Sequence, residues 1–146
     1  MSLNKIQDEI IEEFSLFEDW LDRYDYLIEL GNKLPDIDPA YKTDEYLING
    51  CQSKVWLNAD YKDGKVWFQA DSDALIVRGI VALLVKVLNG QPAKEILDSD
   101  LRFIDEIGLK QNLSPTRSNG LLAMVKKMKT YAMAFSYRNE SGEIES

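Results

Sequence analysis

Apolar residues recur every three or four positions over several stretches of the chain, a spacing typical of amphipathic helices. This pattern predicts one helix over residues 3–14, a second over 16–30 and a long last helix over 115–135. Residues 74–88 are apolar on nearly all sides, so we expect the helix that they form to lie in the centre of the protein.

Residues that favour helix ends stand beside each of these stretches. Ser15, three residues before Glu18, matches a capping box for the second helix, which Gly31 would end. The run Asp71-Ser72-Asp73 offers three capping side chains ahead of the central helix. In Ser114-Pro115, the serine would cap the last helix and the proline would occupy its first position.

Alternation of apolar and polar residues predicts a small antiparallel sheet between the second helix and the central one. Its three strands are expected at residues 46–48, 53–60 and 65–71. Asp63-Gly64 has the composition of a hairpin turn between the last two of these strands. We expect helices to cover the apolar face of the sheet, and Trp56 and Trp67 to pair on the opposite face.

Length, composition and charge narrow the functional class. The 146 residues suit a single domain, with a frayed tail over 139–146. The net charge of −8 comes from residues 1–50, which carry 13 acidic and 4 basic side chains. Such a chain is a poor candidate for binding nucleic acid. No stretch is suited to a signal peptide or a membrane span, so we expect a cytoplasmic protein. The acidic half suits either a solvated surface or a docking surface for a basic partner.

The absence of histidine and the presence of one cysteine exclude most catalytic and metal centres. Ser-His-Asp and Cys-His catalysis both need histidine. Zinc, haem and iron–sulfur sites usually need several cysteine or histidine ligands. No glycine-rich phosphate loop occurs, and a single cysteine rules out an intrachain disulfide.

Cys51 is therefore the candidate reactive residue, because it follows the turn signal Asn49-Gly50 at the start of a predicted strand. A lone cysteine is often an inert, buried apolar residue. Reactivity requires the thiolate, and the candidate activators are Lys54, Arg78, Arg117 and the N-termini of the last two long helices. Sulfur exchange suits a cysteine without a base better than acyl transfer does, and a one-cysteine thiol peroxidase stays open.

Three segments, in order and at their spacing, resemble the SufE family of sulfur acceptor proteins, and the resemblance covers nearly the whole chain. The segments are residues 50–57 (GCQSKVWL), 71–79 (DSDALIVRG) and 113–121 (LSPTRSNGL), with support from 22–24 (DRY) and 27–31 (LIELG). The resemblance implies an α+β fold like that of IscU-type scaffolds, with a three-stranded antiparallel sheet packed against helices. The three cysteine ligands of such scaffolds are absent here.

The resemblance also implies a role in iron–sulfur cluster assembly. Cys51 would accept persulfide sulfur from a cysteine desulfurase of the SufS type, stimulate that enzyme and deliver the sulfur to a SufBCD-type scaffold. The protein would then be a sulfur-transfer partner rather than a stand-alone enzyme, and it would carry no cofactor, since the PLP belongs to the desulfurase. Residues that would line the Cys51 site or contact a partner are Gly50, Gln52, Ser53, Asp71, Asp73 and Arg117.

Three alternatives stay open at this point. Asp71 and Asp73 suit helix capping as well as the Cys51 site. The cysteine could serve a thiol peroxidase or redox sensor instead of a sulfur carrier. It could also be inert, in a protein that acts only as an adaptor. For a carrier, we expect Cys51 to lie against apolar residues in the free protein and to swing out in a complex.

Overall fold

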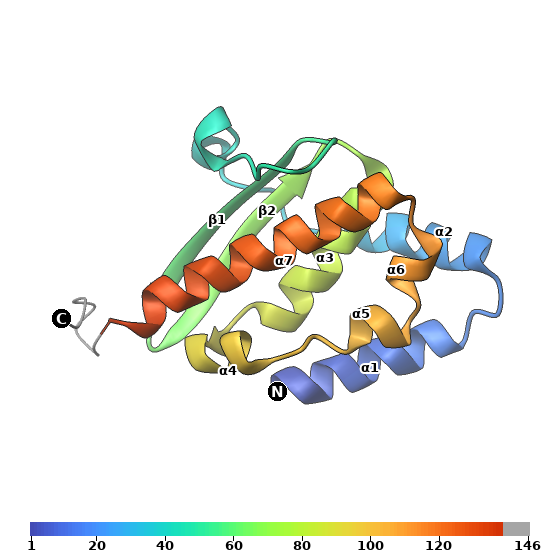
Figure 1. Ribbon diagram of the computed structural model, residues 1–146, viewed down its shortest axis with the longest axis horizontal. Helices are drawn as coiled ribbons and strands as arrows, with labels where there is room; N and C mark the ends of the chain where they lie inside the picture. The colour runs from blue at the N-terminus through green and yellow to red at the C-terminus, as the bar shows by residue number, and fades with distance from the viewer. Residues whose placement is uncertain (139–146) are drawn as a thin grey trace.

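The computed structural model describes residues 1–138 and shows a three-stranded antiparallel sheet packed against helices (Figure 1). The α+β class expected from the sequence is confirmed. The expected frayed tail at 139–146 lies outside the described residues. The helices are α1 (Leu3–Ser15), α2 (Trp20–Asn32), α3 (Leu75–Leu88), α4 (Ala93–Asp98), α5 (Phe103–Glu106), α6 (Leu109–Asn112) and α7 (Pro115–Ser136), and the strands are β1 (Val55–Lys62), β2 (Lys65–Ser72) and β3 (Gln91–Pro92).

The first two helices form as the pattern predicts, but the capping box between them does not. Ser15 is the last residue of α1, and its hydroxyl donates to the Glu12 carbonyl. The second helix begins four residues later than expected, at Trp20, because Asp19 caps it by accepting the Leu21 N–H at 2.8 Å. Asp19 has the extended backbone conformation of an N-cap residue, so it caps α2 in place of Ser15.

The sheet is built on a hairpin with the expected turn. β1 and β2 pair antiparallel over their full length, and Asp63 and Gly64 both take positive φ, 55° and 76°, in the turn. The expected strand at 46–48 is wrong: residues Asp44–Tyr46 form a 3₁₀ turn, and only Leu47 makes an isolated bridge, to Trp56. The third strand is β3 instead, which pairs with the start of β2.

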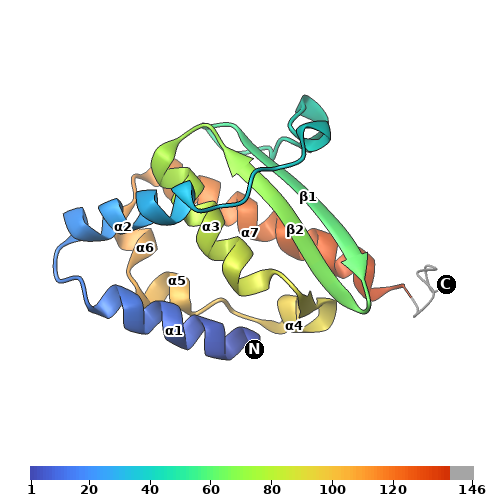
Figure 2. The ribbon, with the colours of Figure 1, turned by 180° about the vertical axis from the view of Figure 1, so that it is seen from behind.

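α3 is the central helix, as expected, and one of its faces packs on β2 while α2 packs on another (Figure 2). Gly31 is not a C-terminal cap, because α2 continues through it to Asn32. It lies instead where α2 and α3 touch, and a Cβ on Gly31 would come within 2.9 Å of the Gly79 nitrogen. A Cβ on Gly79 would come within 2.2 Å of the Leu27 carbonyl oxygen. Two glycines thus allow these helix backbones into contact.

The segment between α2 and β1 covers part of the other face of the sheet. Gln69 on β2 accepts the Asp38 N–H at 2.9 Å, and the Lys42 ammonium lies 5.1 Å from the centre of the Trp56 ring. Trp56 is therefore buried, at 8% exposure, whereas Trp67 is 43% exposed. The two tryptophans do not pair as expected, because the strand register places Trp56 opposite Asp71.

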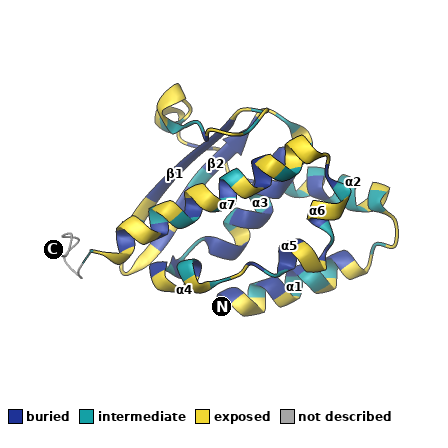
Figure 3. Cartoon of the chain, in the orientation of Figure 1, coloured by how far each residue is buried: buried dark blue, intermediate teal, exposed yellow. Residues whose placement is uncertain are grey.

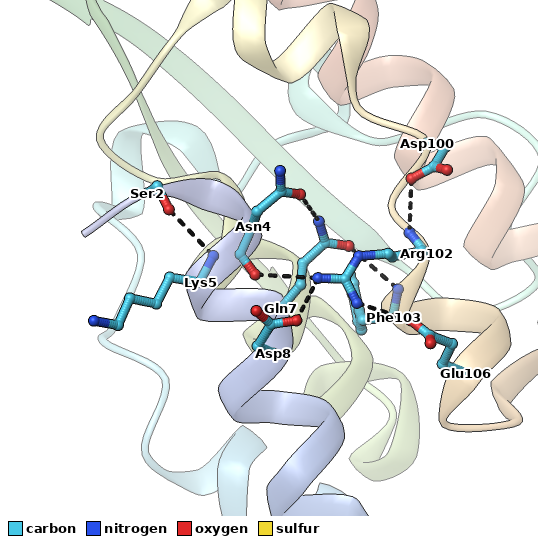
Figure 4. Close-up of polar contacts among 9 residues, drawn as sticks. All are labelled: Ser2, Asn4, Lys5, Gln7, Asp8, Asp100, Arg102, Phe103 and Glu106. Carbon is cyan, nitrogen blue, oxygen red and sulfur yellow. Dashed lines mark hydrogen bonds and ion pairs between the residues drawn. The ribbon is translucent and has the colours of Figure 1, made fainter.

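A polar cluster fastens α1 to α5, away from the sheet. The Arg102 guanidinium donates to Asp8 and to Glu106, at 2.5 and 2.9 Å, and reaches the Asn4 carbonyl (Figure 4). The fully buried Gln7 accepts the Phe103 N–H at 3.2 Å. These bonds satisfy polar groups at the junction of two helices that are distant in the sequence.

The last helix begins where Ser114-Pro115 predicts, with the Ser114 hydroxyl accepting the Arg117 N–H at 3.3 Å. One side of α7 is buried against the protein and the other is exposed along its length (Figure 3). Leu122 is 50% exposed on this outer side, whereas Met124 is buried. In the part of the chain that the structure describes, no helix combines the length and apolarity needed to cross a membrane.

Candidate functional site

Cys51 lies on a short loop, residues 49–54, that hydrogen bonds hold at both ends. At one end, the Ile48 N–H donates to the Val55 carbonyl at 2.9 Å, beside the Leu47–Trp56 bridge. Gly50 turns the chain with a positive φ of 92°, a conformation that glycine adopts without strain. The sequence signal Asn49-Gly50 therefore marks a real turn, and this turn presents Cys51.

The Asp71–Asp73 segment fixes the other end of the loop. The Lys54 N–H donates to the Asp73 carboxylate at 3.0 Å, while the Lys54 carbonyl accepts from the Ser72 hydroxyl and the Asp73 N–H. The expected capping of α3 by these side chains is not the main role that the structure shows. Only the Ser72 hydroxyl bonds near the helix start, to the Ala74 N–H, and Ala74 is the N-cap residue.

A cavity of about 360 Å³ opens beside Cys51, between the loop, α3 and the first turns of α7. Its apolar wall consists of Val77 and Ile80 from α3 and Met124 from α7. Its polar lining includes side chains from the loop and from the start of α7, namely Gln52, Ser53, Ser114, Thr116 and Arg117. The thiol thus lies at a boundary between apolar and polar surfaces.

The Cys51 thiol makes one weak hydrogen bond, from Sγ to the Gly120 carbonyl oxygen at 3.6 Å. Gly120 has no side chain, so the space beside Sγ is open on this side. A Cβ at this position would lie 3.7 Å from Sγ, which is an ordinary contact distance. The residue is half-buried, and burial raises the pKa of the Cys51 thiol. Burial therefore disfavours the thiolate form of Cys51 in this structure.

The candidate activators identified from the sequence separate into two groups. Arg78 is paired with the Asp71 carboxylate at 3.1 Å, without the N–H alignment of a hydrogen bond, and Asp71 also pairs with Lys42 at 3.2 Å. Neither Arg78 nor Lys54 lines the cavity. Arg117 and the N-terminus of α7 do line it, and Val77 brings the first turn of α3 to its wall as well.

The structure brings together half of the residues expected to accompany Cys51. Gln52, Ser53 and Arg117 line the cavity with it. Gly50 shapes the loop, and Asp71 and Asp73 lie outside the cavity, where they hold other segments in place. Sequence reasoning did not assign the remaining lining residues, which are Val77, Ile80, Ser114, Thr116, Gly120 and Met124.

Two spacings could have indicated part of this set. Val77 and Ile80 are three residues apart on one helix, and Gly120 and Met124 are four apart on another, so each pair shares a helix face. Only tertiary packing shows that the two faces meet at Cys51. Within residues 1–138, no three acidic or cysteine side chains gather in a way that would hold a metal ion.

Comparison with known proteins agrees with this picture. Residues 8–132 match the protein family described as "SufE: Fe-S metabolism associated domain". An uncharacterized SufE-like protein of Rhizobium etli is 44% identical over 130 residues, which cover 86% of this chain and 88% of the relative. An uncharacterized SufE-like protein of Synechocystis is 40% identical over 92% of this chain and 84% of the relative.

Two further matches extend the comparison. SufE-like protein 1 of Arabidopsis thaliana, named as chloroplastic/mitochondrial, is 38% identical over 90% of this chain and 36% of that longer protein. The solution structure of a hypothetical protein from Thermus thermophilus superimposes with a TM-score of 0.73, at 24% identity, over 88% of this chain and 93% of that one. This last likeness concerns the fold alone.

Proposed function

The chain belongs to the SufE family, whose domain is associated with Fe–S metabolism, and we propose that within this role it accepts and carries sulfur on Cys51. The donor would be the active-site persulfide of a cysteine desulfurase, which the protein also stimulates. The observation that carries the proposal is the position of the chain's one thiol on the wall of a cavity, without a base beside it.

Sulfur exchange fits this site because it needs no hydroxyl or water to be deprotonated. The Cys51 thiolate attacks the terminal sulfur of the donor persulfide. A sulfur–sulfur bond forms at Cys51 as the one in the donor breaks, and the donor thiolate leaves and takes up a proton. The terminal sulfur moves from the donor cysteine to Cys51 without net oxidation or reduction, so no cofactor is required of this chain.

The raised pKa of the Cys51 thiol gives the free protein a protective state. Burial raises the pKa of the Cys51 thiol and so disfavours the thiolate in the free protein, and we propose that a partner alters the surroundings of the loop. The loop has the construction for such a change, because its two ends are held by hydrogen bonds while the Cys51 side chain has one weak bond of its own. The apolar wall would then shelter the persulfide between partners.

The partners in this proposal are a SufS-type cysteine desulfurase, which supplies PLP, and a SufBCD-type scaffold that receives the sulfur. Gly50, Gln52, Ser53 and Arg117 lie around the thiol, so they would contact whichever protein reaches it. We propose the cytoplasm as the working compartment, although the Arabidopsis relative is named as an organelle protein.

The proposal is tested by intact mass after incubation with a cysteine desulfurase, PLP and cysteine. We expect the protein to gain one sulfur atom and Cys51→Ser to gain none. Because Cys51 is half-buried and makes only one weak bond, the serine variant should fold normally, which its unfolding curve would verify.

A second arm, with dilute peroxide, separates the alternatives. Gain of oxygen with no gain of sulfur would identify a thiol peroxidase or redox sensor and contradict the proposal. No modification in either arm would identify a protein whose cysteine is inert.

A further inference from the structure

The cavity beside Cys51 is much larger than a transferred sulfur atom requires. One sulfur atom needs little more room than a water molecule, about 30 Å³. The cavity holds about 360 Å³, and small-molecule pockets in proteins have volumes of roughly 300 to 1,000 Å³. Its size therefore suits a small molecule attached to the sulfur, not the sulfur alone.

The lining of the cavity favours a ligand with one anionic end and one less polar end. Arg117 forms no ion pair within residues 1–138, although the protein as a whole is strongly acidic. It is an exposed residue in the first turn of a 22-residue helix, and the dipole of that helix attracts anions. Its backbone N–H is bonded to the Ser114 hydroxyl, so its guanidinium is the group that would meet an anion. Val77, Ile80 and Met124 supply the apolar wall on which a carbon–sulfur chain would lie.

We propose that this cavity binds a low-molecular-weight persulfide that carries a carboxylate, of the size of cysteine persulfide, and that Cys51 takes sulfur from it without a donor protein. The carboxylate binds the Arg117 guanidinium at the start of α7, and the persulfide lies along the apolar wall toward the thiol. This inference rests on the proposed role of Cys51 as a sulfur acceptor and adds a second class of donor.

The transfer balances in the same way as the transfer from a protein. The Cys51 thiolate attacks the outer sulfur of the small persulfide, and the sulfur–sulfur bond of that molecule breaks. Its inner sulfur leaves as a thiolate and takes up the proton that Cys51 lost, which gives free cysteine and a persulfide on Cys51. No oxidant or reductant is consumed.

The test uses the full-length chain, freshly prepared cysteine persulfide and no desulfurase, with intact mass as the readout. We expect the gain of one sulfur atom at a rate that saturates with persulfide concentration. Arg117→Gln should raise the KM about tenfold, because a charge-assisted contact is lost. Cysteamine persulfide, which lacks the carboxylate, should react no faster with the parent chain than with Arg117→Gln. Lys94→Gln, an exposed cation on α4, serves as the matched control and should leave the KM unchanged.

The outcomes distinguish this inference from the proposed function. Loading by a desulfurase without loading by cysteine persulfide overturns the inference alone. Loading by cysteine persulfide without loading by a desulfurase supports the inference. It contradicts the proposal that a desulfurase is the donor. Loading that never saturates, or that is equal for Arg117→Gln and the parent chain, shows reaction in solution without a binding site and overturns the inference.

Discussion

Two contacts in this protein depend on a helical glycine, and they differ in the space that they leave. At Gly79, α3 meets α2 so closely that a Cβ would lie 2.2 Å from the Leu27 carbonyl oxygen. At Gly120, α7 meets the Cys51 loop, and a Cβ would lie 3.7 Å from the sulfur. Both glycines belong to segments that resemble the family, yet one closes the core and the other borders an open cavity.

The same residue type closes a contact between two helices in one place and leaves room beside the candidate site in the other. The contact between α2 and α3 positions the central helix. A Cβ on either of its glycines would lie less than 3.0 Å from backbone atoms of the other helix. The contact between α7 and the loop keeps unused room around a thiol that makes one weak hydrogen bond. The cavity on this side leaves room for an atom to be added to the Cys51 sulfur.

Gly79→Ala should have the largest effect on stability. The methyl group would overlap backbone atoms of α2, so the two helices must separate, at a cost of about 2 kcal/mol or more after the gain in helix propensity. Urea denaturation measures this loss. A variant as stable as the parent chain would show that the α2–α3 contact is not closed.

Asp73→Ala should have an intermediate effect that is felt at the loop. It removes the carboxylate that accepts the Lys54 N–H, which should lower the free energy of unfolding by about 1 kcal/mol. We also expect Cys51 to react faster with iodoacetamide, because one end of its loop is released. Asp36→Ala, which removes an exposed carboxylate from the segment after α2, is the matched control and should change neither value. Equal Cys51 reactivity in both variants would refute the role of Asp73 as a clamp.

Gly120→Ala should have a small effect of the opposite sign. The added methyl fits at contact distance, and alanine favours the helix, so the free energy of unfolding should rise by up to about 1 kcal/mol. Side by side with Gly79→Ala in the same denaturation series, this variant tests the comparison itself. Destabilisation by both substitutions to the same extent would abolish the distinction between a closed and an open contact.

The smallest expected effect concerns the pH dependence of the Cys51 thiol. Because burial raises its pKa, alkylation of the folded protein at neutral pH should be slower than alkylation of an unstructured cysteine peptide. The folded pKa exceeds the unfolded one, so this group favours the folded state at low pH and loses that contribution as pH rises through the folded pKa. The alkylation rate as a function of pH, with and without denaturant, checks this. Faster reaction in the folded state would reveal an activator that the described residues do not provide.

The sequence predicted those elements in which the spacing of apolar residues recurs over several turns or along a whole strand. The helices and the hairpin follow from spacings that recur over many residues, and Ser114-Pro115 and Asp63-Gly64 mark their ends correctly. The third strand is only two residues long, so it has no period to detect. The expected strand at 46–48 failed because its short apolar run also suits a 3₁₀ turn followed by a single bridge.

The candidate site was predictable only where a residue type is rare. Cys51 and its turn could be found because there is one cysteine and because glycine after asparagine signals a turn. The cavity could not be predicted, because Val77 and Ile80 have the same apolar character as the other buried residues of the central helix. From the sequence, Asp71 and Asp73 could either cap a helix or bond to another segment. The register of β1 with β2 brings Lys54 next to Asp73, so Asp73 accepts the Lys54 N–H instead of capping α3.

The central claim, that Cys51 is the acceptor of sulfane sulfur, is tested most directly by a single turnover. A desulfurase loaded with one persulfide is mixed with this protein, and the masses of both are followed in time. We predict that the donor loses its sulfur and Cys51 gains one with the same rate constant, before free sulfide accumulates. Loss of the donor sulfur as sulfide, while the mass of this protein stays unchanged, would contradict the account.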